Sequence, residues 1–143
     1  MISEVRHADV GDIELIAEIS AENLHESWSA GSLRGIFENA AYRVFVCGRL
    51  GYIIISVVAD ECSILSLGVS AGSRRRGIGR ALTEAAAACA RECDCSAVYL
   101  EVRASNAPAV KLYESCGFEY CGKRPGFYQN PAEDAKLYKF SII

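Results

Sequence analysis

The stretch RRRGIGRAL, residues 74–82, is the segment on which our prediction of the fold depends. It places four arginines around two glycines where an alanine-rich helical pattern begins, in a chain of net charge -3. The start of a helix leaves about four backbone N–H groups without partners and carries partial positive charge, so it binds phosphate groups. Gly77 and Gly79 allow a close approach, and the loop is therefore predicted to hold a polyphosphate. The arginines that strengthen its positive field are Arg74, Arg75, Arg76 and Arg80.

Two better-known phosphate-binding loops do not match this segment. The Walker pattern G-x4-G-K-[ST] is absent from the sequence. The dinucleotide pattern G-x-G-x-x-G requires a glycine where the chain has Leu82, and it opens a parallel β-α-β unit. From the loop alone, a charged and solvated helix entry without function remains an alternative.

The segments before the loop predict a sheet of consecutive antiparallel strands. An opening strand covers 2–8, and Asp9 is the expected N-cap of a helix over 9–24. A short second helix begins near Ser29. Three β-rich runs then follow with short polar turns between them. These runs are YRVFVC (42–47), GYIIISVVA (51–59) and SILSLGVS (63–70).

The segments after the loop complete the predicted order β-α-α-β-β-β-α-β-α-β-β. A helical stripe from Gly77 is rich in alanine, which lets a helix lie close to a sheet. The remaining predicted elements are the strand 97–102, the helix that Asn106 and Pro108 open and Gly117 ends, and the strands 118–124 and 134–143 joined by the loop 125–133.

Length and composition predict one domain over residues 1–143. The chain is 51% hydrophobic and 23% charged, which suits a single packed core. No run approaches the roughly 18 apolar residues of a membrane span, and the charged N-terminus does not resemble a signal peptide. We therefore expect a soluble, cytoplasmic protein without membrane association.

Seven cysteines in a chain without an export signal are expected to be reduced. Most are predicted to be small core residues. The tightest group, at 89, 93 and 95, lacks the paired spacing of a zinc site. No metal is expected. The arginine cluster is too compact to predict nucleic-acid binding.

The segment LEVRASNAPAVKLYESCGF, residues 100–118, makes the interpretation specific. Together with R-R-x-G-x-G before a helix, it resembles the GNAT superfamily of acyl-coenzyme A N-acyltransferases. Within that superfamily it is most similar to the RimI-like branch, which acetylates the N-terminal alanine of a ribosomal protein. The resemblance implies an α/β (α+β) GNAT fold. Its mixed, mostly antiparallel sheet would have about seven strands, with about four helices and a splayed parallel strand pair at the centre.

The resemblance also implies acetyl-CoA as the acyl-donor substrate. Backbone amides of residues 74–80 would surround the pyrophosphate. The pantetheine arm would enter the gap beside the strand 99–102 and pair with backbone as an added strand does, with Asn106 on its opposite side. The implied cofactor-binding residues are Leu67, Gly68, Val69, Arg74, Arg75, Arg76, Gly77, Ile78, Gly79, Arg80 and Asn106.

Acyl transfer to an amine needs a base for the amine and an acid for the departing thiolate. An α-amino group has a pKa of about 8, against about 10.4 for lysine, so a modest base is sufficient at an N-terminus. Glu101 matches the glutamate of the LEVR motif, and burial of its carboxylate would raise its pKa. The alternative is a salt-bridged or surface glutamate. Direct attack without an acyl-enzyme is what the resemblance implies.

Tyr113 is the predicted acid that returns a proton to the coenzyme A sulfur. Its alternative is a tyrosine that only packs in the core. A cysteine nucleophile is the rival mechanism. Neither histidine has a sequence context that suggests a Cys–His pair, and Cys116 is more simply explained as a packing residue at a helix end.

The acceptor side departs from the RimI-like pattern in several places. The segment 24–28 contains no proline, the strand before the loop reads SILS over 63–66, and Tyr138 stands where methionine is common. These segments, with a Phe-Tyr pair in the last loop, would line the acceptor side. The candidate substrate-binding residues are Trp28, Phe127 and Tyr128, with ordinary packing as the alternative. Nearby acids either favour a cationic acceptor or simply face water, and they are Glu22, Glu26, Glu133 and Asp134.

The predicted function is acetyl-CoA-dependent acetylation of a primary amine. The preferred acceptor is the α-amino group of a protein N-terminus. A small-molecule amine or a lysine is the second hypothesis. The third is a sensor that binds acyl-CoA without catalysing transfer.

Overall fold

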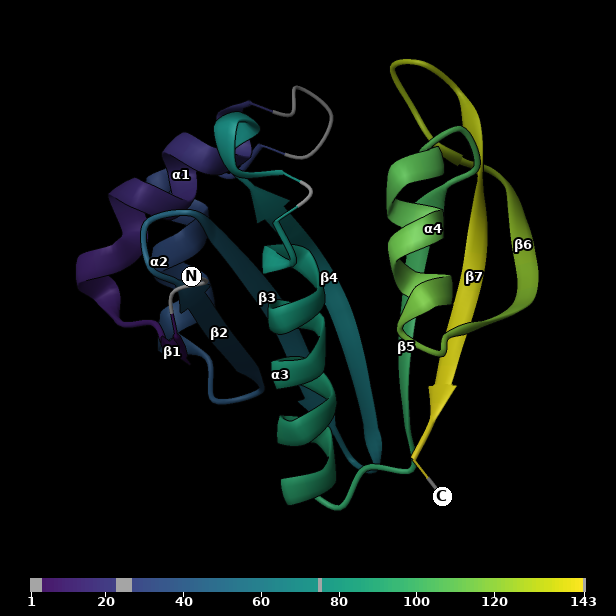
Figure 1. Ribbon diagram of the computed structural model, residues 1–143, viewed down its shortest axis with the longest axis horizontal. Helices are drawn as coiled ribbons and strands as arrows, with labels where there is room; N and C mark the ends of the chain where they lie inside the picture. The colour runs from purple at the N-terminus through teal and green to yellow at the C-terminus, as the bar shows by residue number, and fades with distance from the viewer. Residues whose placement is uncertain (1–3, 23–26, 75, 143) are drawn as a thin grey trace.

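The computed structural model describes residues 4–22, 27–74 and 76–142. Its seven strands form one sheet in the order β1-β2-β3-β4-β5-β7-β6 (Figure 1). The strands are β1 (Val5–His7), β2 (Tyr42–Cys47), β3 (Gly51–Val58), β4 (Glu61–Val69), β5 (Ala97–Arg103), β6 (Glu119–Tyr128) and β7 (Glu133–Ser141). The helices are α1 (Ile13–Ala21), α2 (Ala30–Glu38), α3 (Ile78–Glu92) and α4 (Ala107–Ser115), with short 3-10 turns at Val10–Asp12 and Ala71–Ser73.

The predicted order of elements is confirmed, and the larger differences in element boundaries concern the first helix and the last loop. The first helix begins as a 3-10 turn capped by Asp9, and α1 ends at Ala21 rather than continuing to residue 24. The predicted loop over 125–133 is mostly strand, because β6 continues to Tyr128. Pro125 is tolerated there because β6 is the edge of the sheet, where a missing N–H removes no ladder bond.

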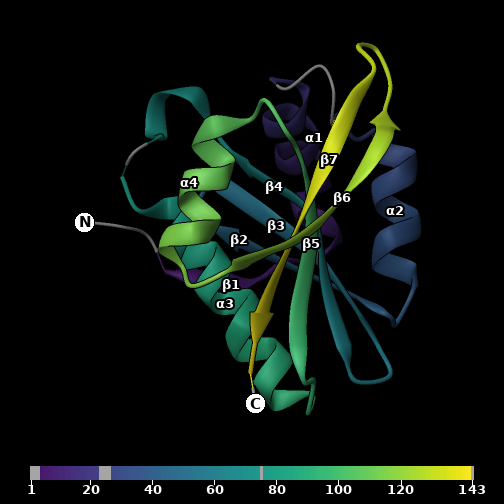
Figure 2. The ribbon, with the colours of Figure 1, turned by 90° about the vertical axis from the view of Figure 1, so that its right-hand side faces the viewer.

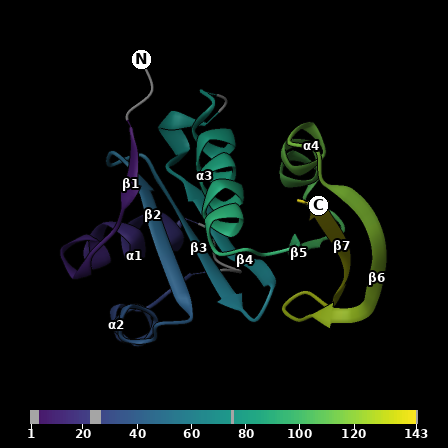
Figure 3. The same cartoon turned by 90° about the horizontal axis from the view of Figure 1, so that it is seen from below.

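The helices cover the sheet unevenly. Helices α3 and α4 lie on one face, and α1 and α2 lie on the other (Figure 3). The second pair packs on β2, β3 and β4, where Ile16, Leu33 and Ile54 form a core with no exposed surface. On the side of β5, β7 and β6 that faces away from α4, no described helix is present (Figure 3). We call this side of β5, β7 and β6, which no described helix covers, the open face.

The only parallel pair among the described strands is β4 and β5, and it separates halfway along. Pairing runs from Glu61 opposite Ala97 to Ile64 opposite Leu100, although both strands continue further. At this point the register between β3 and β4 shifts, so Leu65 is an extra residue without a partner among the described strands. Such a bulge bends its strand and disrupts the ladder. The divergence of β4 from β5 is visible in Figure 1.

Most cysteines are core residues, as predicted. Cys47, Cys62, Cys89 and Cys95 are buried, Cys93 and Cys116 are half-buried, and Cys121 is exposed. Burial raises the pKa of the Cys62 thiol to about 12 and that of Cys89 to about 11, so both stay protonated at neutral pH.

None of the described helices is long and apolar enough to cross a membrane.

A tight contact fixes the far end of β4 against β3. The ring of Tyr52 is 2% exposed, and its hydroxyl lies 2.8 Å from the hydroxyl of the buried Ser66. The ring passes directly over Gly68, where a Cβ atom would lie only 2.3 Å from a ring carbon. Glycine is therefore required at this position by the packing of Tyr52.

The substitution Gly68→Ala is expected to destabilise the fold by about 1–3 kcal/mol, because a buried ring must move to admit the methyl group. The measurement is urea unfolding. Gly35→Ala is the matched control, since a Cβ there meets nothing within 4 Å. In the middle of α2 it should be neutral or stabilising by up to about 1 kcal/mol. Equal stability of the Gly68→Ala protein and the wild type would contradict this account.

Candidate active site

An opening lies between the diverging halves of β4 and β5, with α4 beside it. Its residues come from β4, β5, the turn after β5 and α4. They are Ile64, Leu65, Ser66, Leu67, Leu100, Glu101, Val102, Asn106, Ala109 and Tyr113. The loop before α3 and the turn between β6 and β7 lie at the same end of the molecule as this opening (Figures 1 and 2). Four of the residues singled out by the sequence, Leu67, Glu101, Asn106 and Tyr113, therefore line one opening.

The glycine-containing loop forms the entry to α3. Gly77 has a φ of +80° and is the N-cap of the helix, a left-handed conformation that glycine adopts without strain. No acidic residue occupies the first turn of α3, so that turn supplies no carboxylate to its own N–H groups and positive dipole end. Gly79 lies close to α4, where a Cβ would be 3.0 Å from a terminal methyl group of Leu112. The start of α3 therefore has the positive dipole end and the backbone N–H groups that a phosphate group would need.

The arginines of the loop differ in exposure and in hydrogen-bond partners. Arg74 and Arg76 are exposed, and Arg74 Nε donates to the carbonyl of Val69 at 3.4 Å. Arg80 points to the end of α4, where its Nη2 donates to Ser115 at 3.0 and 3.2 Å. Arg80 thus joins two helices as well as adding charge. Arg75 lies outside the described residues.

The other predicted cofactor residues surround the opening in different ways. Leu67 lines it, while Gly68 and Val69 continue β4 beyond its last pairing with β5. Ile78 is 1% exposed, so its side chain belongs to the core and only its backbone faces the loop. The side-chain oxygen of Asn106 caps α4 by accepting from Ala109 N–H at 3.3 Å. Its amide NH₂ donates to no atom within the described residues.

Glu101 and Tyr113 line the same opening from opposite sides of β5. Val98, Leu100 and Val102 face α3 and α4, so Glu101, which alternates with them, lies on the open face. Tyr113 belongs to α4, is 6% exposed and packs beside Phe118 with 5.6 Å between ring centres. A group held in the gap between β4 and β5 would have a carboxylate on one side and a phenol on the other.

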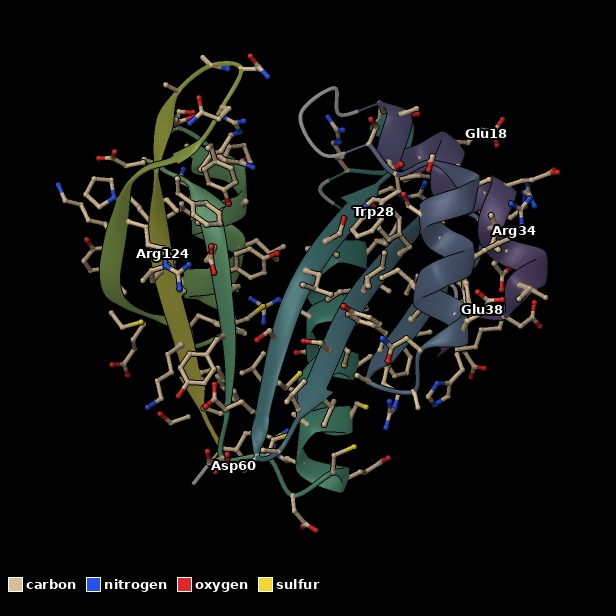
Figure 4. The ribbon with its side chains drawn as sticks, turned by 180° about the vertical axis from the view of Figure 1, so that it is seen from behind. Glu18, Trp28, Arg34, Glu38, Asp60 and Arg124 are labelled. Atoms are coloured by element: carbon tan, nitrogen blue, oxygen red, sulfur yellow. The ribbon has the colours of Figure 1, made fainter. Side chains whose placement is uncertain are left out.

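The Glu101 carboxylate is half-buried rather than fully buried, and a cation lies near it, as the alternative of a salt-bridged glutamate describes. Its side chain is 33% exposed, and Arg124 Nη1 lies 3.8 Å from its Oε1. The reason is that no described helix covers this face of β5, and that β6 presents an arginine opposite. Figure 4 shows Arg124 on this face, across the diverging strands from Trp28.

Arg103, which follows Val102 on β5, fastens the turn between β6 and β7. Its guanidinium donates to the carbonyls of Gln129 at 2.8 Å and Pro131 at 3.0 Å, and it lies 3.2 Å from Glu133. It also stacks 4.6 Å from the ring centre of Tyr128. Hydrogen bonds from Ser105 and Arg103 lower the pKa of Glu133 below its ordinary value of 4.5. The turn is thereby held beside the open face.

The predicted acceptor-side aromatics are only partly available. Trp28 is half-buried against the core of α1 and α2, and its backbone N–H donates to Ser20 at 2.9 Å. Phe127 is 45% exposed, whereas Tyr128 is covered by Arg103. The rest of the segment 24–28, apart from Ser27, lies outside the described residues.

The expectation that Tyr138 lines the acceptor side is wrong. Tyr138 pairs with Leu100 in register and therefore faces α4, where it is 2% exposed. Its hydroxyl donates to Glu114 Oε2 at 2.9 Å. Burial and this hydrogen bond raise the pKa of Tyr138 to about 12. It is a structural residue beneath α4.

The acids near the acceptor side are already occupied. Glu22 accepts from the N–H of Ala71 at 2.9 Å, and Asp134 accepts from the N–H of Gly126 at 2.9 Å. Glu133 is bound by Arg103, and Glu26 lies outside the described residues. Within the described part of the chain, these carboxylates do not form an unpaired anionic surface, so they give little support to a cationic acceptor.

A larger groove of about 330 Å³ lies between α3 and β7, but its chemistry does not suit acyl transfer. It is lined by Thr83, Glu84, Ala87, Arg91, Cys116, Phe118 and Phe140. Burial raises the pKa of Cys116, which leaves its thiol a poor nucleophile. We therefore place the candidate site in the smaller opening, where the predicted acid and base meet.

Three relevant residues were not identified from the sequence. Arg124 reaches Glu101 across β7, which depends on a strand order that spacing does not reveal. The role of Arg103 depends on the return of the β6–β7 turn to the end of β5. The bulge at Leu65 lies in a run of continuous β-favouring residues, and nothing in that run distinguishes the extra residue.

Comparison with known proteins identifies the class. Residues 13–118 match the model of the Acetyltransferase (GNAT) family. The chain belongs to this family and is an acetyltransferase, and its seven-stranded sheet with the splayed β4–β5 pair is the GNAT fold.

The chain is also similar to individual acetyltransferases. A Bacillus subtilis protein named as a candidate ribosomal protein bS18-alanine N-acetyltransferase is 32% identical over 96% of this chain and 95% of that protein. The crystal structure of the ribosomal-protein-S18-alanine N-acetyltransferase from Escherichia coli superposes with a TM-score of 0.87. The two sequences are 28% identical, and the superposition covers 99% of this chain and 94% of the Escherichia coli chain. A streptothricin acetyltransferase of Streptomyces lavendulae is 37% identical over 69% of this chain and 56% of that protein.

The Arg103–Glu133 contact gives a pH-dependent prediction. Because the pKa of Glu133 is lowered in the folded protein, its stabilising contribution is present above about pH 4.5 and is lost as the pH falls through the folded value. Glu133→Gln should therefore lower the melting temperature at pH 7, and this deficit should be smaller near pH 3. Thermal unfolding at both pH values measures this difference. Glu119→Gln, an exposed site on β6, is the control. An equal deficit of Glu133→Gln at both pH values would exclude the ionic explanation.

Proposed function

We propose that this protein transfers the acetyl group of acetyl-CoA to the α-amino group of a protein N-terminus. The observation that carries the proposal is that Glu101 and Tyr113 line one opening from opposite sides of β5, next to the entry of α3. The similarity over nearly the whole chain to bS18-alanine N-acetyltransferases supports an N-terminal alanine as the acceptor.

Several features of the chain fit acetyl-CoA. The N–H groups at the entry of α3 would bind the pyrophosphate, with Arg74 and Arg76 adjacent to it. Beyond Ile64, β4 has a strand partner only on the side of β3 among the described strands. Its other edge can therefore pair with the amides of the pantetheine arm, which would extend between β4 and Asn106. When bound, acetyl-CoA supplies the thioester that an amine can attack.

The residues around the opening can move the two protons that the reaction requires. Glu101, on the open face, accepts a proton from the attacking amine, directly or through a water molecule. As the new C–N bond forms and the C–S bond breaks, Tyr113 donates its hydroxyl proton to the sulfur from the side of α4.

The catalytic assignment predicts a specific loss of turnover. Glu101→Gln and Tyr113→Phe should each lower kcat by about 100-fold or more while acetyl-CoA still binds, since each removes a positioned acid or base. Release of free thiol and the mass of an Ala-peptide product measure turnover. Glu119→Gln and Tyr99→Phe are the matched controls. Unchanged turnover in either site variant would refute its role. A wild type that binds acetyl-CoA yet acetylates no amine would favour a sensor.

Binding of acetyl-CoA can be tested separately. Titration calorimetry should show that Arg74→Gln binds about 10-fold more weakly than the wild type, because a hydrogen bond to a charged group contributes about 1.5–3 kcal/mol. Arg34→Gln, an exposed arginine on α2 (Figure 4), changes the charge equally and should bind as the wild type does. Equal weakening by both substitutions would indicate only a general effect of charge.

A small-molecule amine is the second candidate acceptor. It is favoured by the 37% identity to the streptothricin acetyltransferase, although the chain spans about half the length of that relative. A panel that sets Ala-peptides against small amines distinguishes the two. Higher kcat/KM for the small amines would replace the protein N-terminus as the acceptor.

A further inference from the structure

Arg124 occupies an unusual position beside the candidate base. It lies on β6, two strands away from Glu101, and its register partner on β7 is Ala135, which is fully buried. Ala135 also pairs with Arg103 on β5. Because alanine presents only a methyl group, a long side chain from β6 can extend across β7 towards β5. Figure 4 shows Arg124 on the open face of the sheet.

The contacts of Arg124 are weak and leave donors available. Its Nη1 lies 3.8 Å from Glu101 Oε1, which is beyond hydrogen-bond distance, and its guanidinium lies 5.5 Å from the ring centre of Phe127. Its side chain is 57% exposed. Among the described residues, Glu101 is its only polar partner. A half-exposed pair of this kind contributes little and is readily displaced by a better-placed anion.

Arg103 shows the contrast on the same face. Its guanidinium is engaged by the carbonyls of Gln129 and Pro131 and by Glu133, and its side chain is 13% exposed. Arg103 is thus a structural cation, whereas Arg124 presents a guanidinium fork to the solvent. Phe127 supports that fork without competing for its N–H groups.

An incoming amine must share Glu101 with Arg124. A cationic acceptor would be repelled by the guanidinium, and the nearby carboxylates of opposite charge are already bonded. An acceptor that carries a carboxylate a few ångströms from its amine satisfies both groups. The carboxylate takes the fork of Arg124 in a bidentate geometry, and the amine gains access to Glu101.

We propose that Arg124 is a specificity-determining residue that binds a carboxylate close to the reacting amine, so that the preferred acceptor is a protein N-terminus whose second residue is Asp or Glu. This inference rests on the proposed function, and it adds a requirement on the acceptor that the candidate acid and base do not impose.

The test compares peptides that differ only at the second residue, Ala-Glu, Ala-Gln and Ala-Lys. The wild type should acetylate the Ala-Glu peptide with kcat/KM about 10-fold above the Ala-Gln peptide, mainly through KM, as a charged hydrogen-bonded pair predicts. Arg124→Gln should remove this difference, and Arg124→Lys should restore part of it. Lys123→Gln is the matched control. Its side chain lies on the opposite face of β6, since Lys123 pairs with Lys136 and Arg124 with Ala135.

The outcomes separate this inference from the proposed function. Equal kcat/KM for the Ala-Glu and Ala-Gln peptides, or a preference for Ala-Lys, overturns the role of Arg124 while leaving peptide acetylation intact. An equal change in Arg124→Gln and Lys123→Gln also overturns it. If no peptide is acetylated, the proposed function fails. Binding of the same peptides, followed by the fluorescence of Trp28, the single tryptophan, then decides whether Arg124 still selects the carboxylate.

Free amino acids form a separate arm, because they also carry a carboxylate beside an amine. Acetylation of free glutamate with the same dependence on Arg124 would support carboxylate recognition and overturn the protein N-terminus as its source. Absence of such acetylation, together with the Ala-Glu preference, supports the proposal as stated.

Discussion

The loss of hydrogen bonding between β4 and β5 is the constraint on which the site depends. The two parallel strands are paired only from Glu61 to Ile64 on the β4 side, and the extra residue at Leu65 turns β4 away from β5. Two strand edges are thereby exposed inside a sheet, where such edges are normally paired. A fold that leaves this defect at its centre also brings α3, α4 and the open face of β5 to its borders.

The residues of the candidate site lie on both faces of the sheet, on either side of this gap. The face of α3 and α4 carries the N-terminus of α3 and Tyr113, and the open face carries Glu101. A donor that enters from one face and an acceptor from the other would meet only in the gap.

Patterns among neighbouring residues predicted the fold well. The site depends on contacts between residues far apart in the sequence, and these were predicted less well. The N-cap Ser29, the Asn106–Pro108 helix start and Gly117 are read from neighbouring residues, and each marks the helix boundary in the structure. The exposure of Glu101, by contrast, depends on which helices cover which half of the sheet. Arg124 and Tyr138 were missed or misplaced because their faces follow from a strand order and from bulges that spacing along the chain does not encode.

The irregular edge strand has a consequence for solubility in concentrated solution. Strand β6 ends the sheet, and a straight edge of this length would invite another polypeptide to add to it. Pro125 removes a donor from this edge, two register shifts break its regularity, and Lys123 and Arg124 place like charges along it. A second molecule would therefore find no continuous ladder to extend, and self-association into fibrous aggregates by this route is discouraged.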